Sequence, residues 1–189
     1  MYENYTELSV DGLTSSTSLQ GAHVLLLREK DGSVLVALPL DSAGYKRVQV
    51  AVTSKDYTAS HLMLQLAKEA GLRLLGVRVL PPLGGQTLGR LDFEDGNVLR
   101  VLDVPIADAV VTSLESGCSL WAAPAMMEAQ RKRHNPEGTV GLPLRGMEDR
   151  LLRQALEAAV EEDNFELAAQ IRDELKSREE ETEDAPDKQ

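Results

Sequence analysis

Apolar and polar residues alternate along several stretches of the chain, and these stretches predict β-strands. Residues 22–30 and 33–40 are two apolar, β-rich runs joined by the turn Asp31-Gly32, a pattern typical of a β-hairpin. A second hairpin is predicted over residues 87–103, about the turn-rich tetrad 94–97. Single strands are expected at residues 5–10, 72–80 and 119–123.

A different spacing, with apolar residues three or four positions apart, predicts helices between these strands. In residues 58–70 the apolar positions recur every four residues, and Gly71 follows where a left-handed residue often ends a helix. Prolines at suitable first-turn positions predict two more helices, at residues 105–117 and 124–134. Residues 41–57 favour no single structure, since their valines alternate as in a strand while Ser42 offers a helix cap.

The order of these elements predicts an α+β domain that has a mixed β-sheet with helices packed on it. We expect this domain to span residues 1–133. Residues 134–146 contain two prolines and three glycines, which is typical of a linker.

Two short amphipathic segments follow the linker, and they predict a C-terminal two-helix hairpin at residues 147–178. Asp163 is expected to cap the second helix by accepting a hydrogen bond from the amide of Glu166, so that this helix restarts at Asn164. A hairpin of this size rarely buries enough apolar surface to be stable alone, so its remaining apolar face needs a partner. Residues 179–189 are expected to form a disordered acidic tail.

The second helix of this hairpin has the spacing FE-x-AA-x-x-RD over residues 165–173. In this it resembles the UVR motif of the excision-repair proteins UvrB and UvrC and of several bacterial stress and proteolysis adaptors. The resemblance implies that the hairpin binds another hairpin of the same kind, in the same or a different protein. The alternative is an ordinary helical hairpin docked on its own domain. The partner-binding residues implied are Phe165, Ala168, Ala169, Arg172 and Leu175.

Composition narrows the possible functions of the chain. Its 189 residues carry a formal net charge of -11, which argues against a broad electrostatic surface for nucleic acid. The single cysteine, Cys118, excludes an intrachain disulfide and a cysteine-rich zinc site. No segment reaches the roughly 18 apolar residues of a membrane span. We therefore expect a cytoplasmic protein without membrane contact.

The succession of elements over residues 22–127 resembles the bifunctional nuclease domain family, whose members often carry a UVR motif after a short linker. The matching points are LPL at 38–40, a helix ending at Gly71, VRVL at 77–80, and the spacing of Asp103, Asp108 and Ala109. The family typically reads D-x-R-P-S-D-A at the last of these, whereas this chain reads D-V-P-I-A-D-A. The family scaffold is matched, but much of its polar surface is not.

This resemblance implies cleavage of DNA or RNA, and it points to Asp103, Asp108 and His61 as catalytic residues. Asp103 and Asp108 could meet where a strand runs into a helix and bind Mg²⁺ or Mn²⁺ through their oxygen atoms. Each residue also has a structural interpretation. Asp103 could end its strand and cap the next helix, Asp108 could face solvent, and His61 could be a packing residue.

Basic residues in two regions are candidates for contact with nucleic acid, and each could equally be a solvated helix surface. Aromatic residues at 4% leave few platforms for stacking bases. Two functions therefore stay open: a metal-dependent nuclease, or a non-enzymatic adaptor that acts in DNA repair or stress response through the hairpin. In either function we expect a homo-oligomer with a UVR-containing partner. The basic candidates are Lys46, Arg47, Arg131, Lys132 and Arg133.

Overall fold

The computed structural model describes residues 2–15, 23–32, 34–54, 58–83, 85–133, 144, 147–161 and 163–183. Seven strands in this part of the chain form one sheet in the order β3-β2-β1-β7-β4-β5-β6. Neighbouring strands are antiparallel except β4 and β7, which run parallel, so the predicted mixed sheet is confirmed. The strands are β1 (Thr6–Ser15), β2 (His23–Glu29), β3 (Leu35–Leu40), β4 (Leu72–Val79), β5 (Leu88–Asp95), β6 (Val98–Pro105) and β7 (Leu120–Ala122).

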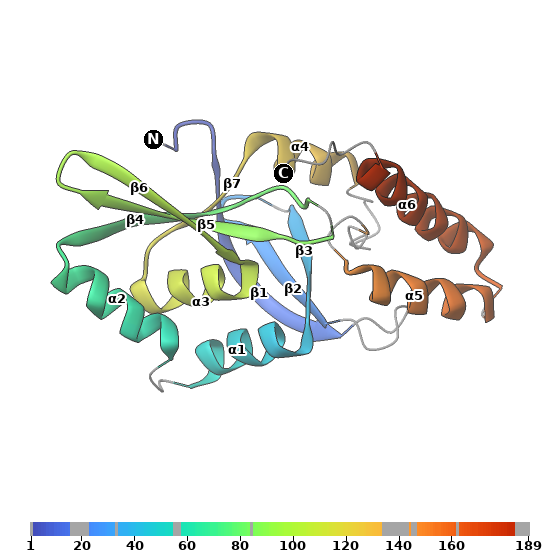
Figure 1. Cartoon of the computed structure of the whole chain (residues 1–189), viewed down its shortest axis with the longest axis horizontal. Coiled ribbons are helices and arrows are strands. Elements are labelled where there is room, and N and C mark those ends of the chain that lie inside the picture. Colours follow the sequence, from blue (N-terminus) through green and yellow to red (C-terminus); the bar gives the residue numbers. More distant parts are fainter. Residues whose placement is uncertain are drawn as a thin grey trace.

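Helices cover this sheet and extend beyond it, which confirms the predicted α+β class (Figure 1). Helices α1, α2 and α3 lie together on one side of the sheet, and α4 lies on the other side. The pair α5 and α6 forms the predicted C-terminal hairpin beside the β3 end of the sheet. The helices are α1 (Ser42–Thr53), α2 (Ala59–Glu69), α3 (Ile106–Ser116), α4 (Pro124–Arg133), α5 (Asp149–Glu161) and α6 (Phe165–Glu183).

Helix α1 occupies most of the segment to which the sequence assigned no structure. Its cap is Asp41, whose Oδ1 accepts a hydrogen bond from the amide of Gly44 at 2.5 Å. Gly44 is needed where α1 crosses α3, because a Cβ there would lie 3.0 Å from the Cβ of Ala107. Of the alternating valines only Val48 is buried. The alternation of these valines therefore does not reflect a strand, because Val50 and Val52 are exposed on a capped helix.

Helix α2 is confirmed with Thr58 as its cap and with Gly71 in the left-handed conformation at φ 79°. The leucines that mark its period in the sequence nevertheless point outward: Leu62 is 59% exposed and Leu66 is 62% exposed. Met63 and Ala67 pack against the core instead. Spacing thus identified the helix, but the face that packs is set by the smaller and more flexible side chains.

The described residues form two separate apolar cores. The larger core lies between the sheet and its helices, and α3 approaches the sheet so closely that a Cβ on Gly89 would lie 2.1 Å from that of Ala109. The smaller core belongs to the hairpin alone. It consists of the buried residues Met147, Leu152, Ala155 and Ile171, with five partly buried leucines packed around them.

The predicted linker, residues 134–146, lies outside the described residues except for Leu144. Helix α6 continues to Glu183, beyond Arg178 where the sequence pattern ended the hairpin. An ion pair between Lys176 and Glu180, four residues apart, joins successive turns of this extension at 3.7 Å. The end of the predicted acidic tail, residues 184–189, is again outside the described part.

Candidate functional site

The turn of the hairpin is a left-handed cap at the end of α5. Asp163 has φ 57°, and the amide of Asn164 donates to the carbonyl oxygen of Ala159 at 2.8 Å. This bond, with the one from the Asp163 amide to Val160, is the Schellman pattern. Asn164 then caps α6 by accepting from the amide of Leu167 at 3.2 Å. The prediction that Asp163 is the cap was wrong by one residue, because Asp163 is used to close α5.

Arg178, near the end of α6, links this helix to the residues that precede α5. Its guanidinium donates to the carbonyl oxygens of Met147 at 2.7 Å and Leu144 at 2.8 Å. It also pairs with Asp149 at 2.6 Å and with Glu174 at 2.9 Å. The side chain is only 10% exposed. Charged groups this buried are stable only when they are paired and hydrogen-bonded, and Arg178 is both.

The same guanidinium lies against the sheet domain at Gly85. This glycine has φ 75°, and a Cβ on it would lie 2.8 Å from Nη1 of Arg178 and 3.0 Å from the carbonyl oxygen of Met147. Only a residue without a side chain allows this approach. The hairpin therefore docks on the turn that precedes β5.

The predicted partner-binding residues divide between the two faces of α6. Phe165 is 67% exposed, and the side chain of Arg172 is 73% exposed. Ala168 is buried inside the hairpin, and Leu175 packs against its core. Ala169 lies between these groups and is half-buried. The outward stripe of α6, spaced by three or four residues, consists of Phe165, Ala169, Arg172 and Lys176.

Asp103 lies on β6 and faces away from α3. It pairs in register with Arg90, and their side chains form two contacts, at 2.5 and 2.7 Å. The hydrogen bonds from Arg90 lower the pKa of the Asp103 carboxyl. Because Gly89 faces α3 and adjacent residues alternate, Arg90 and Asp103 belong to the opposite face of the sheet.

Asp108 lies in the first turn of α3, on the other face of the sheet from Asp103. Its Oδ1 pairs with Nε of Arg47 on α1 at 2.7 Å. The structure therefore separates the two predicted catalytic aspartates, and it brings Asp108 to an arginine that was predicted only to contact nucleic acid.

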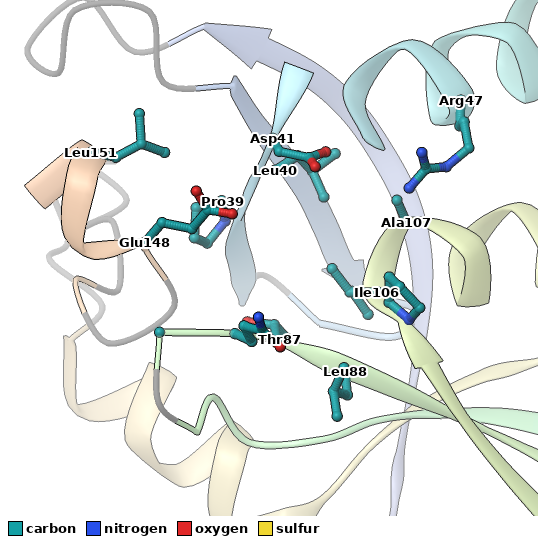
Figure 2. Close-up of a pocket in the computed structure, with 13 residues that line it drawn as sticks. Pro39, Leu40, Asp41, Arg47, Thr87, Leu88, Ile106, Ala107, Glu148 and Leu151 are labelled. Carbon is teal, nitrogen blue, oxygen red and sulfur yellow. The ribbon is translucent and has the colours of Figure 1, made fainter. Parts of the chain in front are cut away.

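A cavity of about 220 Å³ opens beside this ion pair, between the sheet domain and the hairpin (Figure 2). Figure 2 shows Arg47 of α1 on one side and Glu148, the residue just before α5, on the other. Thr87, just before β5, lines the cavity, is 7% exposed and has a hydroxyl without a hydrogen-bond partner in the described part of the chain. The remaining lining comes from Pro39, Leu40, Asp41, Gly85, Gln86, Leu88, Pro105, Ile106, Ala107 and Leu151.

The other predicted site residues lie apart from this cavity. His61 is in the first turn of α2, where its ring contacts Gln65 at 3.0 Å. Lys46 is exposed on α1. Arg131 on α4 forms an ion pair with Glu29 at 2.7 Å, so its charge is already balanced by a residue of the same chain. The side chains of Lys132 and Arg133 lie outside the described part of the chain.

The structure does not bring together the two carboxylates predicted to bind Mg²⁺ or Mn²⁺. No group of three or more histidine, cysteine, aspartate or glutamate residues in the described part of the chain could hold a metal ion. Asp103 and Asp108, the predicted ligands, are on opposite faces, and an arginine already occupies each of them. A carboxylate paired with arginine is a poor cation ligand until that pair breaks.

Three residues of these sites were not predicted. Arg178 marks only the end of the hairpin in the sequence pattern, and its bonds to carbonyl groups more than 30 residues earlier in the chain carry no local signal. Thr87 carries no sequence signal of its own, and Gly85 indicates only a turn, because the roles of both depend on the packing of the hairpin against the segment before β5.

Comparison with known families locates one match, and it falls on the hairpin. The family model described as the UvrB/uvrC motif matches residues 150–181, which cover nearly all of α5 and α6. The UVR resemblance is thereby confirmed for this part of the chain, and UVR motifs mediate protein–protein interaction. No curated protein matches the chain. None of the described helices combines the length and apolar character needed to cross a bilayer.

Proposed function

We propose that the chain is an adaptor that binds a second UVR hairpin, in another copy of itself or in a repair protein, through the outward stripe of α6. The observation that supports this most directly is the exposure of Phe165, which is 67% although it is the largest apolar side chain of the hairpin. Val160, at the end of α5, is 52% exposed. Exposed apolar side chains at a helical turn are typical of an anchor for a partner.

The inner face of the hairpin supports the same proposal, because its side chains already pack against each other in the hairpin core. Leu152 and Ile171 are fully buried in the hairpin core, and Arg178 closes its ends. A partner is therefore expected to bind to the outward stripe rather than to replace the inner contacts. Arg172 and Lys176 would add cation contacts to acidic groups of a partner hairpin.

The test uses the full chain and measures binding to itself by sedimentation velocity, and to the UVR hairpin of UvrB by titration calorimetry. Phe165→Asp should abolish association, because a carboxylate would be placed at the centre of an apolar contact. Leu62→Asp is the matched control, since Leu62 is similarly exposed but lies on α2. Association that survives Phe165→Asp, or that is lost only with Leu62→Asp, would refute the proposal.

Phosphodiester hydrolysis is the second candidate, and one observation favours it. The Arg47–Asp108 pair beside the cavity places an arginine next to a potential general base, and such a pair can stabilise phosphate charge and activate water. Purified chain should then degrade single-stranded DNA or RNA in Mg²⁺ or Mn²⁺ buffer, and Asp108→Asn should stop cleavage. Asp103→Asn tests the other predicted residue. Cleavage that persists in both variants would exclude these residues as the site.

A further inference from the structure

The outer edge of β6 pairs with no other strand in the described part of the chain. The sheet ends at β6 on one side and at β3 on the other, and β6 lies at the end away from α5 and α6 (Figure 1). Five of the six residues of β3 are buried, whereas seven of the eight residues of β6 are exposed. An uncovered edge strand presents its free N–H and C=O groups to another strand.

The backbone of β6 offers evenly spaced hydrogen-bonding groups along this edge. The turn at residues 96–97 has two residues, so the residues that flank it form a hydrogen-bonded pair, and such pairs alternate along β5 and β6. The alternation continues to Ile106, whose amide donates to the carbonyl oxygen of Thr87 at 3.2 Å. The even-numbered residues of β6 therefore bond to β5. The residues that direct their N–H and C=O groups outward are Leu99, Val101 and Asp103.

The side chains of β6 are apolar on both faces of the sheet. Val98 and Leu102 lie on the face that carries α3, and Leu99 and Val101 lie on the opposite face, with Asp103. The four apolar side chains are between 47% and 51% exposed. A long uncovered strand with exposed apolar residues is typical of a contact with another strand.

The charges along this edge are balanced within the chain. Although the whole chain has a formal net charge of -11, each of the four carboxylates of β5 and β6 pairs with an arginine of the sheet. Asp103 pairs with Arg90 at 2.5 Å, and Asp95 pairs with Arg100 at 3.2 Å. The other two pairs are Arg73–Glu94 and Arg78–Asp92. Because the edge is neutral, it favours a neutral apolar strand as its partner over a highly charged one.

A second copy of β6 meets these requirements in one antiparallel register. Two identical antiparallel strands related by a two-fold axis place one residue opposite its own copy. Centring the pair on Arg100 or Asp103 would place like charges opposite each other, which destabilises a strand pair. Centring it on Val101 places valine opposite valine, and it places the outward N–H and C=O groups of Leu99 opposite those of Asp103 in the second copy.

The remaining side chains also match in this register. Val98 lies opposite Val104 of the second copy, and Arg100 lies opposite Leu102, which its aliphatic stem can cover. Centring the pair one residue later would bring Pro105, which has no N–H, into the hydrogen-bonded positions and would set the strand against the start of α3. Only the register centred on Val101 keeps all its pairs within β6.

We propose that β6 pairs with β6 of a second copy, antiparallel and centred on Val101, so that the two sheets become one. The hairpin lies at the opposite end of the sheet from β6, so this dimer presents its two hairpins at its far ends. The contact is separate from the outward stripe of α6, on which the proposed function depends. A single strand pair is a small interface, so we expect a Kd of about 0.1 mM.

Sedimentation equilibrium tests this contact in the full chain with Phe165→Asp, which removes association through the hairpin. Dimer should form as the concentration rises from about 0.01 mM to about 1 mM. The sedimentation test of the hairpin is made at about 1 µM, where a Kd of about 0.1 mM leaves nearly all chains unpaired through β6. Failure of one contact is thereby distinguished from failure of the other.

Charge changes at the centre of the pair test the register. In the Phe165→Asp chain, Val101→Lys should abolish the dimer because two ammonium groups would meet, and Val101→Glu should abolish it because two carboxylates would meet. An equal mixture of these two chains should restore the dimer, which also shows that both variants fold. Val52→Lys is the matched control, since Val52 is 54% exposed on α1, and it should leave the Kd unchanged.

Amide exchange measured by NMR locates the new hydrogen bonds. In the Phe165→Asp chain, the outward amides of Leu99, Val101 and Asp103 should become more protected between about 0.01 mM and about 1 mM. The amides of the even-numbered residues of β6 already bond to β5, so their protection should change less.

Four results would overturn the proposal. The first is that no dimer forms at about 1 mM. The second is that Val101→Lys keeps the parent Kd, and the third is that the mixture of oppositely charged chains stays monomeric. The fourth is that Val101→Lys alone pairs more tightly than the parent, which would place position 101 opposite Asp103 and exclude the register centred on Val101.

Discussion

Arg178 and Met147 are joined by a hydrogen bond of 2.7 Å from Nη1 to the carbonyl oxygen, across 31 positions of sequence. The bond links the last turns of α6 to the residues just before α5. It makes the hairpin a closed structure whose two ends are fixed to each other and to the turn at Gly85. The hairpin is thus positioned by its inner side, and its outward stripe is left for a partner.

Replacing this arginine should loosen the hairpin. Arg178→Met removes the contacts of this guanidinium to Leu144, Met147, Asp149 and Glu174, so the free energy of unfolding of the hairpin should fall by about 2–4 kcal/mol. Hydrogen exchange of the α5 and α6 amides measures this change. Arg172→Met is the control, because that side chain is 73% exposed and its loss should cost less than about 0.5 kcal/mol. Equal protection in the two variants would contradict the role of Arg178.

A gain in stability is expected at the hairpin turn. Asp163 adopts φ 57°, a conformation that glycine takes without the steric cost of a Cβ. Asp163→Gly should therefore raise the free energy of unfolding by about 1 kcal/mol in urea denaturation. Asp163→Ala keeps a Cβ and should bring no gain, so the same gain in both variants would show that the backbone conformation is not the cause.

The contact between α3 and the sheet should tolerate no added volume. Gly89→Ala would place a Cβ 2.1 Å from that of Ala109, so α3 must shift, and the free energy of unfolding should fall by roughly 1–3 kcal/mol. Adding Ala109→Gly should recover part of this loss, and the recovery measures their coupling. Gly12→Ala is the control, since no atom lies within 4 Å of its added Cβ. A double variant whose effect is the sum of the single ones would refute the contact.

Stability should also fall at alkaline pH through Tyr2. Burial raises the pKa of this phenol, and the hydrogen bond to Asp92 at 2.8 Å raises it further. An unfolded tyrosine ionises near pH 10. Above that pH the unfolded state binds fewer protons than the folded state, so the free energy of unfolding decreases as pH rises. Tyr2→Phe should make the decrease between pH 9 and 11 shallower, and parallel curves for the two proteins would contradict this.

The sequence predicts the fold class because periodicity and turn residues are local signals. Both hairpins of the sheet, helix α2 with Gly71, and the C-terminal pair were found in this way. Helix α1 was missed because its valines alternate on an exposed surface, and because Gly44 counts against a helix unless the approach of Ala107 is known. The sequence also does not predict which face of α2 packs on the core, because the regularly spaced leucines of this helix are the exposed ones.

The sites were harder to predict because they depend on residues far apart in the sequence. Arg47 and Asp108 were assigned to different roles, yet they form one ion pair where α1 crosses α3. Asp103 and Asp108 are five positions apart, but the sheet lies between them. Only the short-range part of the hairpin, with its fixed spacing of small, acidic and basic residues, could be recognised from the chain alone.

Because Glu148 and Leu151 of the hairpin form one wall of the cavity, the state of the hairpin and the contents of the cavity are thermodynamically linked. A molecule that fills the cavity stabilises the docked position of α5. If a partner draws α5 away, it weakens binding in the cavity by the same factor by which the bound molecule weakens the partner. Any molecule that binds in the cavity and any partner that moves the hairpin would be coupled through this shared wall.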